Sequence, residues 1–145
     1  MIDSPSTTDL LNIQRLLFDY AWACDSGDWE LLRSVFTDDA RLDYSSTGGP
    51  AAGRDEVVAW LQESLSLLGF IQHVVSNFRI EISGDQAEGR AMFLTSFRLP
   101  GSDDVVLTGG YYDLELVRTS NGWRMRSFVE ENQWMSSGVG TNSHG

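Results

Sequence analysis

One histidine lies inside the body of this chain, and its chemistry gives the first functional hypothesis. His73 falls in a run that reads as a strand, whereas His144 lies one residue from the C-terminus, in a Gly/Ser-rich tail. An imidazole can take up and return a proton near neutral pH without a cofactor. A catalytic His73 would be a general base, and a structural His73 would bond to a backbone carbonyl. The strand pattern alone leaves both roles open.

Asp25 is the candidate partner of His73. It lies at the C-terminal end of an expected helix, where the helix dipole disfavours a carboxylate unless a cation such as an imidazolium compensates. In its Asp-Ser-Gly-Asp context it could also be a solvated turn residue. Tyr20 lies five residues earlier, and its phenol could donate to a developing oxyanion or a leaving group. Core packing is the more common role for an aromatic at such a position.

The elements that must position these residues begin with a helix. Apolar residues at steps of three and four predict a helix over residues 9–25, and Gly27 is a natural stop. A second apolar flank predicts that this helix is largely buried. That flank consists of Leu11, Phe18 and Trp22.

Two further helices are expected before the first long strand. Asp28 can cap a short helix predicted over residues 28–36. Asp55 and Glu56 favour the first turn of a longer helix predicted over 54–68. Between them we expect a turn at 38–39, an extended segment at 40–44 and a loop at 45–53, where Ser, Gly and Pro are frequent.

After these helices the apolar period changes to two, which predicts strands. The strand-like runs are residues 70–83, 86–98, 105–118 and 123–134. Short turns join them, so neighbouring strands should be antiparallel. Helices followed by a meander indicate an α+β fold, in which helices cover one face of a strongly bent sheet. The open end of such a sheet is a common place for a small-molecule pocket.

Two strand features predict local distortion. Period two puts His73 on one face of its run together with Ile71, Val75 and Asn77, but the apolar face changes after that point, which predicts a bulge or bend. The paired glycines Gly109–Gly110 predict a bend or a close approach of backbone.

We expect side chains around the sheet to shape the pocket. The candidate substrate-binding residues are Trp22, Tyr44, Trp60, Asn77, Phe93, Phe97, Tyr112 and Ser127.

Composition excludes several classes of function. The 145 residues carry 10 Lys and Arg against 21 Asp and Glu, a net charge of −11, which argues against nucleic acid and against anionic membrane surfaces. With a single cysteine and one histidine in the body of the chain, no metal site is expected. We expect one cytoplasmic domain over residues 9–135, with loose residues 1–8 and a disordered tail at 136–145.

Several short segments occur in the order and spacing of a known protein family. They are YAWACDSGDW at 20–29, FTDDA at 36–40, GP at 49–50, GR at 53–54, QHVVSN at 72–77, GGYY at 109–112 and NGWR at 121–124. On these segments, which span nearly the whole fold, the chain resembles the SnoaL-like members of the nuclear-transport-factor-2-like superfamily.

The resemblance implies a cone-shaped curved antiparallel sheet packed on three N-terminal helices around an apolar cavity. Enzymes of that superfamily include scytalone dehydratase, bile-acid dehydratases, hexachlorocyclohexane dehydrochlorinase, ketosteroid isomerase and polyketide cyclases, most of which need no cofactor. In the eliminating members a strand His removes a proton, a helix-end Asp orients it and a Tyr or Lys assists. His73, Asp25 and Tyr20 match these positions. Relatives with a second His or Asp on the next strand differ from this chain, which has Thr95-Ser96-Phe97 there, so Tyr20 or Tyr112 would have to be the acid.

The resulting hypothesis is a cofactor-independent lyase or isomerase of the dehydratase type. Its substrate would be a small hydrophobic molecule such as a polyketide, a steroid or a cyclic ketone or alcohol, and the assembly a homodimer or homotrimer. Two alternatives stay open: a non-catalytic protein that binds a hydrophobic small molecule, and a small structural subunit of a ring-hydroxylating dioxygenase.

Overall fold

The structure, a computed structural model, describes residues 6–136. Its helices are α1 (Thr7–Ser26), α2 (Trp29–Ser34) and α3 (Arg54–Ser66), with a 3-10 turn η1 (Ser45–Thr47). Its strands are β1 (Phe36–Asp43), β2 (Ala51–Gly53), β3 (Phe70–Ser83), β4 (Gln86–Arg98), β5 (Val105–Thr119) and β6 (Gly122–Met135).

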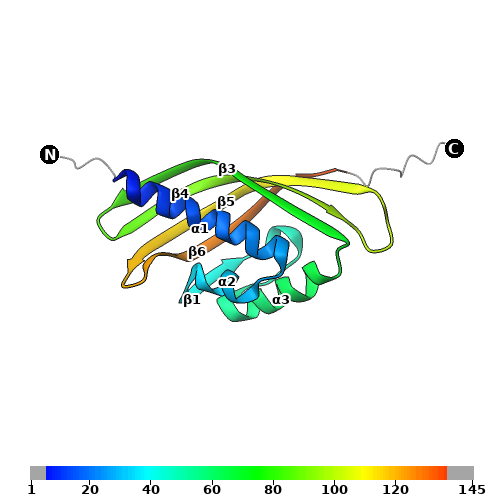
Figure 1. Ribbon diagram of the computed structural model, residues 1–145, viewed down its shortest axis with the longest axis horizontal. Helices are drawn as coiled ribbons and strands as arrows, with labels where there is room; N and C mark the ends of the chain where they lie inside the picture. Colours follow the sequence, from blue (N-terminus) through cyan, green and yellow to red (C-terminus); the bar gives the residue numbers. More distant parts are fainter. Residues whose placement is uncertain (1–5, 137–145) are drawn as a thin grey trace.

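The strands form one curved sheet in the order β2-β1-β6-β5-β4-β3. The four long strands pair antiparallel, which confirms the prediction, while β1 adds a parallel pairing to β6 that the sequence did not indicate. Figure 1 shows α1 lying along the long strands, with α2, α3 and β1 gathered beside one end of that helix. The three helices and the curved sheet match the predicted α+β fold.

Hydrogen bonds at both ends fix α1 in place. The side chain of Ser6 accepts from the amide of Asp9 at 3.3 Å, and Gly27 ends the helix in the left-handed region at φ 72°. The Asp9 carboxylate accepts from Arg118 at 2.8 Å and from the indole of Trp123 at 3.0 Å. These bonds lower the pKa of Asp9 to about 2. The N-terminal end of α1 is thereby tied to the β5–β6 hairpin.

The predicted second apolar flank of α1 is wrong. Leu11, Phe18 and Trp22 are 60%, 43% and 71% exposed, whereas Ile13 and Leu17 are fully buried. The sheet covers only one side of α1, so one stripe of the helix is buried and the other flank faces outward.

The segment after α1 differs from the prediction in detail. Asp28 caps α2 by accepting from the amide of Leu31 at 3.1 Å, but the helix ends at Ser34 rather than at residue 36. The predicted turn at 38–39 is wrong, because both residues lie inside β1, which pairs with β6 from Phe36 onward. The expected loop at 45–53 contains η1 and β2, and β2 pairs with β1.

The predicted bounds of the four long strands agree with the structure to within one residue, and the predicted distortion of β3 is present. β3 and β4 have the predicted bounds, and β5 and β6 differ by one residue at an end or at both ends. The register between β3 and β4 shifts between Ser76 and Arg79, where Asn77 adopts φ 54°. This bulge confirms the predicted change of face.

The glycine pair of β5 also lies at an irregularity. The register with β6 shifts between Gly109 and Gly110, and a Cβ on Gly110 would lie 2.1 Å from the carbonyl oxygen of Glu131. The predicted close approach of backbone is confirmed. A second shift follows between Glu115 and Leu116, and it affects which residues of β6 face the interior.

The ends of the chain are only partly described. Helix α1 begins at Thr7, so residues 7 and 8 are helical and not loose as predicted. Ser136 is hydrogen-bonded to Leu107, and the rest of the predicted tail, like residues 1–5, lies outside the described residues. Within residues 6–136, no helix is both long and apolar enough to cross a membrane.

Candidate active site

The inner face of the sheet encloses a cavity of about 250 Å³ together with α1, η1 and α3. Most of its lining is apolar. The apolar lining residues are Trp60, Leu61, Leu65, Leu68, Ile71, Phe93, Phe97 and Met135. Ten residues with a polar group also line it, but they contribute less of its surface. They are Tyr20, Cys24, Tyr44, Thr47, Ser64, His73, Thr95, Thr108, Glu130 and Asn132.

His73 and Asp25 are in direct contact at this cavity. The Nδ1 atom of His73 lies 2.6 Å from Oδ1 of Asp25, and the His73 backbone amide donates to Oδ2 of Asp25 at 3.0 Å. The side chains are 9% and 20% exposed respectively. The two residues that the resemblance placed together therefore meet, and the carboxylate holds the histidine at two points.

This contact determines which imidazole nitrogen is available to a ligand. An ionised carboxylate can only accept hydrogen bonds, so Nδ1 of His73 must carry the proton that it shares with Asp25. The lone pair of the neutral imidazole is then on Nε2. A histidine held in this tautomer on the wall of an apolar cavity is arranged to act as a general base.

The two phenols of the cavity are hydrogen-bonded to each other. The hydroxyls of Tyr20, on α1, and Tyr44, after β1, form one buried pair. Burial raises the pKa of both phenols well above their ordinary value, so both keep their protons at neutral pH. One hydroxyl must donate to the other, so one O–H of the pair is not used in this bond and can donate to a ligand. Burial likewise raises the pKa of the Cys24 thiol, which disfavours a thiolate nucleophile there.

Glu130 of β6 is the main residue that the sequence did not indicate. Its Oε1 accepts from the hydroxyl of Thr47 at 2.8 Å, and Ser46 donates to its backbone carbonyl at 2.8 Å. Among the described residues it forms no ion pair. Burial raises the pKa of Glu130, and the hydrogen bond from Thr47 only partly offsets this. The cavity thus holds a second acid–base group besides His73.

A bulge in β6 explains why the sequence did not indicate Glu130. In the β5–β6 pairing, Leu116 is opposite Met125 and Glu115 is opposite Ser127, so Arg126 is an extra residue in β6. An extra residue reverses the alternation of side chains along a strand. Glu130 therefore faces the cavity, although strict alternation from Met125 would have placed it outside.

Four of the predicted substrate-binding residues line the cavity, and four do not. Those in the lining are Tyr44, Trp60, Phe93 and Phe97. Trp22 is wrong because it lies on the exposed flank of α1. Asn77 is exposed at the β3 bulge, which turns it away from the face that carries His73.

The other two corrections concern β5 and β6. Tyr112 is fully buried in the core and stacks on Phe93 with ring centroids 4.5 Å apart, so it lies behind the cavity wall and not in the lining. Ser127 was expected to face inward, but the extra residue Arg126 turns it to a separate open hollow.

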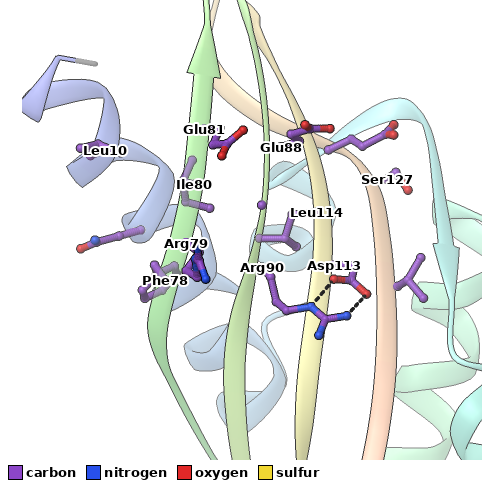
Figure 2. A pocket seen from close by; sticks show the side chains of 14 residues that line it. Leu10, Phe78, Arg79, Ile80, Glu81, Glu88, Arg90, Asp113, Leu114 and Ser127 are labelled. Carbon is purple, nitrogen blue, oxygen red and sulfur yellow. Dashed lines mark hydrogen bonds and ion pairs between the residues drawn. The ribbon is translucent and has the colours of Figure 1, made fainter. Parts of the chain in front are cut away.

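Charged side chains of the sheet make up part of the lining of that hollow. Figure 2 shows Arg90 of β4 facing Asp113 of β5, and their two hydrogen bonds measure 2.7 and 3.1 Å. Arg90 also bonds to Glu131 at 2.8 Å. The charges of Arg90, Asp113 and Glu131 are paired and partly exposed, whereas the carboxyl group of Glu130 forms no ion pair among the described residues.

The raised pKa of Glu130 gives a stability prediction. A carboxyl group that binds its proton more tightly in the folded state than in the unfolded state costs stability once the pH exceeds its ordinary value of 4.5. Glu130→Gln removes that cost and keeps an oxygen that can accept from Thr47. We expect the variant to unfold at higher urea concentration than the wild type at ~pH 8 and at a similar concentration at ~pH 4. Equal midpoints at both pH values would contradict the raised pKa.

Known proteins share both this sequence pattern and this fold. A profile of the SnoaL-like domain matches residues 5–129. A Mycobacterium tuberculosis relative, described as an uncharacterized protein, is 34% identical over 131 residues, which are 90% of this chain and 89% of the relative. A proposed scytalone dehydratase from Novosphingobium aromaticivorans is 22% identical, with a TM-score of 0.81 over 89% of this chain and 87% of that chain. Hexachlorocyclohexane dehydrochlorinase from Novosphingobium barchaimii is 20% identical, with a TM-score of 0.78 over 94% and 96%. These two structures show a common fold, and the sequence match shows more: the chain belongs to the SnoaL-like domain family.

Proposed function

We propose that this protein is a cofactor-independent lyase of the dehydratase type that acts on a small hydrophobic molecule. The observation that carries the proposal is the contact between Nδ1 of His73 and Asp25 at 2.6 Å, which leaves Nε2 of His73 on the cavity wall as a base. Two neighbours in fold are named for eliminations, one of water and one of hydrogen chloride. They support the reaction class by analogy of fold.

The roles follow from the geometry of the cavity. Nε2 of His73 removes a proton from a carbon next to an electron-withdrawing group, and Asp25 stabilises the imidazolium that forms. The free O–H of the Tyr20–Tyr44 pair donates to the carbonyl oxygen of the substrate, where negative charge develops. The predominantly apolar walls suit a ring or an aromatic group, and they exclude water from the transfer.

The test uses a probe that needs a base and no other group. 5-Nitrobenzisoxazole opens when a base removes its ring C–H proton and the N–O bond breaks, which releases a coloured cyanophenolate. We expect the wild type to accelerate this opening and His73→Ala to lose ~10²-fold or more of kcat/KM, the usual range for a general base.

A matched control separates the site from the fold. Gln72→Ala changes an exposed neighbour of His73 on the same strand and should keep the wild-type rate. Circular dichroism checks that His73→Ala is folded. If His73→Ala opens the probe as fast as the wild type, the base assignment is wrong. A wild type that binds the probe without accelerating its opening would make the cavity a binding site without proton transfer.

Three finer statements stay predictions. The choice among elimination, isomerisation and cyclisation, the homodimeric or homotrimeric assembly and the cytoplasmic location follow from the resemblance and composition alone. Sedimentation equilibrium of the full chain decides the assembly, and product analysis decides the reaction.

A further inference from the structure

We propose that Glu130 is the proton donor to the leaving group, and that the substrate is therefore a neutral β-hydroxy carbonyl compound. This inference rests on the proposed function, because it assigns the second proton transfer of the same cavity. It differs from the expectation that a tyrosine supplies this proton.

Glu130 and His73 reach the same cavity from separate strands. β6 carries Glu130 and β3 carries His73, and these strands are not neighbours in the sheet, since β5 and β4 lie between them. The two groups therefore approach a bound molecule from different walls. This arrangement suits an elimination, because the proton and the leaving group depart from adjacent carbon atoms and each can meet its own catalytic group.

Hydrogen bonding leaves one carboxyl oxygen of Glu130 free. The Thr47 hydroxyl donates to Oε1 at 2.8 Å, and Ser46 bonds both the carbonyl of Glu130 and the amide of Asn132, which anchors η1 on β6. No described residue is hydrogen-bonded to Oε2. A protonated Oε2 can thus donate to a ligand while Oε1 stays fixed.

Burial favours the protonated form of Glu130, and the described neighbouring groups add no positive charge that would oppose it. Tyr20 and Cys24 of α1, Tyr44 after β1 and Tyr112 of β5 are all neutral, and each has its own pKa raised in part by the Glu130 carboxylate. His73 is the one group whose charge lowers the pKa of Glu130, and it does so only after it has become an imidazolium. Proton removal by His73 therefore makes Glu130 a stronger acid at the moment when the leaving group needs a proton.

The step balances without a co-reactant. His73 takes the proton of the carbon next to the carbonyl, and the C–H pair becomes the new C=C bond. The C–O bond breaks, its electron pair stays on oxygen, and Oε2 of Glu130 protonates that oxygen to water. The imidazolium then returns its proton to the Glu130 carboxylate through the released water, so the net reaction yields an α,β-unsaturated carbonyl compound and water.

The substrate class follows from what the cavity offers. A hydroxide is a poor leaving group, so a site that contains an acid is suited to a hydroxyl, whereas acetate or a halide departs without one. The Asp25 carboxylate and the acidic surface oppose an anionic substrate. A neutral molecule with a hydroxyl group β to a carbonyl meets both requirements.

The experiment compares two leaving groups that give one product. 4-Hydroxy-4-phenylbutan-2-one loses water and its O-acetyl ester loses acetate, and both yield benzylideneacetone, which is followed by its ultraviolet absorbance. We expect Glu130→Gln to lower kcat/KM for the alcohol by ~10²-fold or more and to leave that for the ester within about threefold of the wild type. His73→Ala should lose both reactions. Glu131→Gln is the matched control, because that neighbour bonds to Arg90 at 2.8 Å and does not line the cavity.

Each other outcome contradicts one proposal. An equal loss for alcohol and ester in Glu130→Gln, or no loss for either, overturns the leaving-group role and leaves the base role of His73 intact. A wild type that opens 5-nitrobenzisoxazole but does not dehydrate the alcohol also overturns it. Full activity of His73→Ala on the ester overturns the proposed function instead.

Discussion

Asp25→Asn is expected to lower kcat for 5-nitrobenzisoxazole opening by about 10²–10⁴-fold without unfolding the protein. The carboxylate accepts two hydrogen bonds from His73, one from the ring and one from the backbone amide. An amide group has only one oxygen to offer. If that oxygen keeps the backbone bond, the NH₂ group faces Nδ1 and favours the tautomer with a proton on Nε2, which is then no longer a base.

The tautomer itself can be measured in this variant. Two-bond ¹H–¹⁵N spectra of the imidazole distinguish the protonated nitrogen, so wild type and Asp25→Asn should show opposite tautomers of His73. Asp28→Asn is the matched control, because Asp28 caps α2 and asparagine is as good a cap. Wild-type turnover in Asp25→Asn, or an unchanged tautomer, would contradict the role of Asp25 as the group that orients His73.

Phe128→Ala is expected to cost about 3–5 kcal/mol of unfolding free energy, the range for removing a fully buried aromatic side chain. Phe128 is 0% exposed. Its ring lies 4.9 Å from that of Tyr20, 4.7 Å from that of Tyr112 and 5.7 Å from that of Tyr44. Truncation leaves a void beneath the Tyr20–Tyr44 pair, so the phenols that we assign to carbonyl binding also lose their support.

Urea denaturation of the purified chain measures this cost. Phe128→Leu keeps most of the volume and should lose less, about 1.5 kcal/mol. A change of the unfolding midpoint at constant slope is expected for both variants. A loss below about 1 kcal/mol for Phe128→Ala would show that the aromatic cluster is not the centre of the core.

Much of the architecture was predictable because local patterns determine it. Turn residues and a period of two gave the bounds of β3 and β4, and Gly27 gave the end of α1. The segment from residue 36 to 53 was predicted less well. Its strands are short, and they form through pairing with β6 and with each other, which no local pattern reveals.

The His73–Asp25 pair of the candidate site was predictable from the sequence, and Glu130 was not. His73 and Asp25 were identified from residue type, position and family resemblance, and they are in contact. Glu130 was missed, and Ser127 was misplaced, for one reason. The extra residue Arg126 reverses the alternation along β6, and a bulge is a property of two paired strands rather than of one sequence.

The sequence by itself determined the order of the three helices and the four long strands, the α+β class and the pairing of an imidazole with a helix-end carboxylate. Tertiary structure decided which side chains face the cavity. The apolar side chains of Phe18 and Trp22 are exposed because the sheet covers only one side of α1. Glu130 faces the cavity because the pairing of β6 with β5 decides which side chains of β6 point inward, and the spacing of residues in the sequence does not. Short stretches of sequence determine the local preference for helix, strand or turn. The burial of a side chain depends instead on which element packs against it.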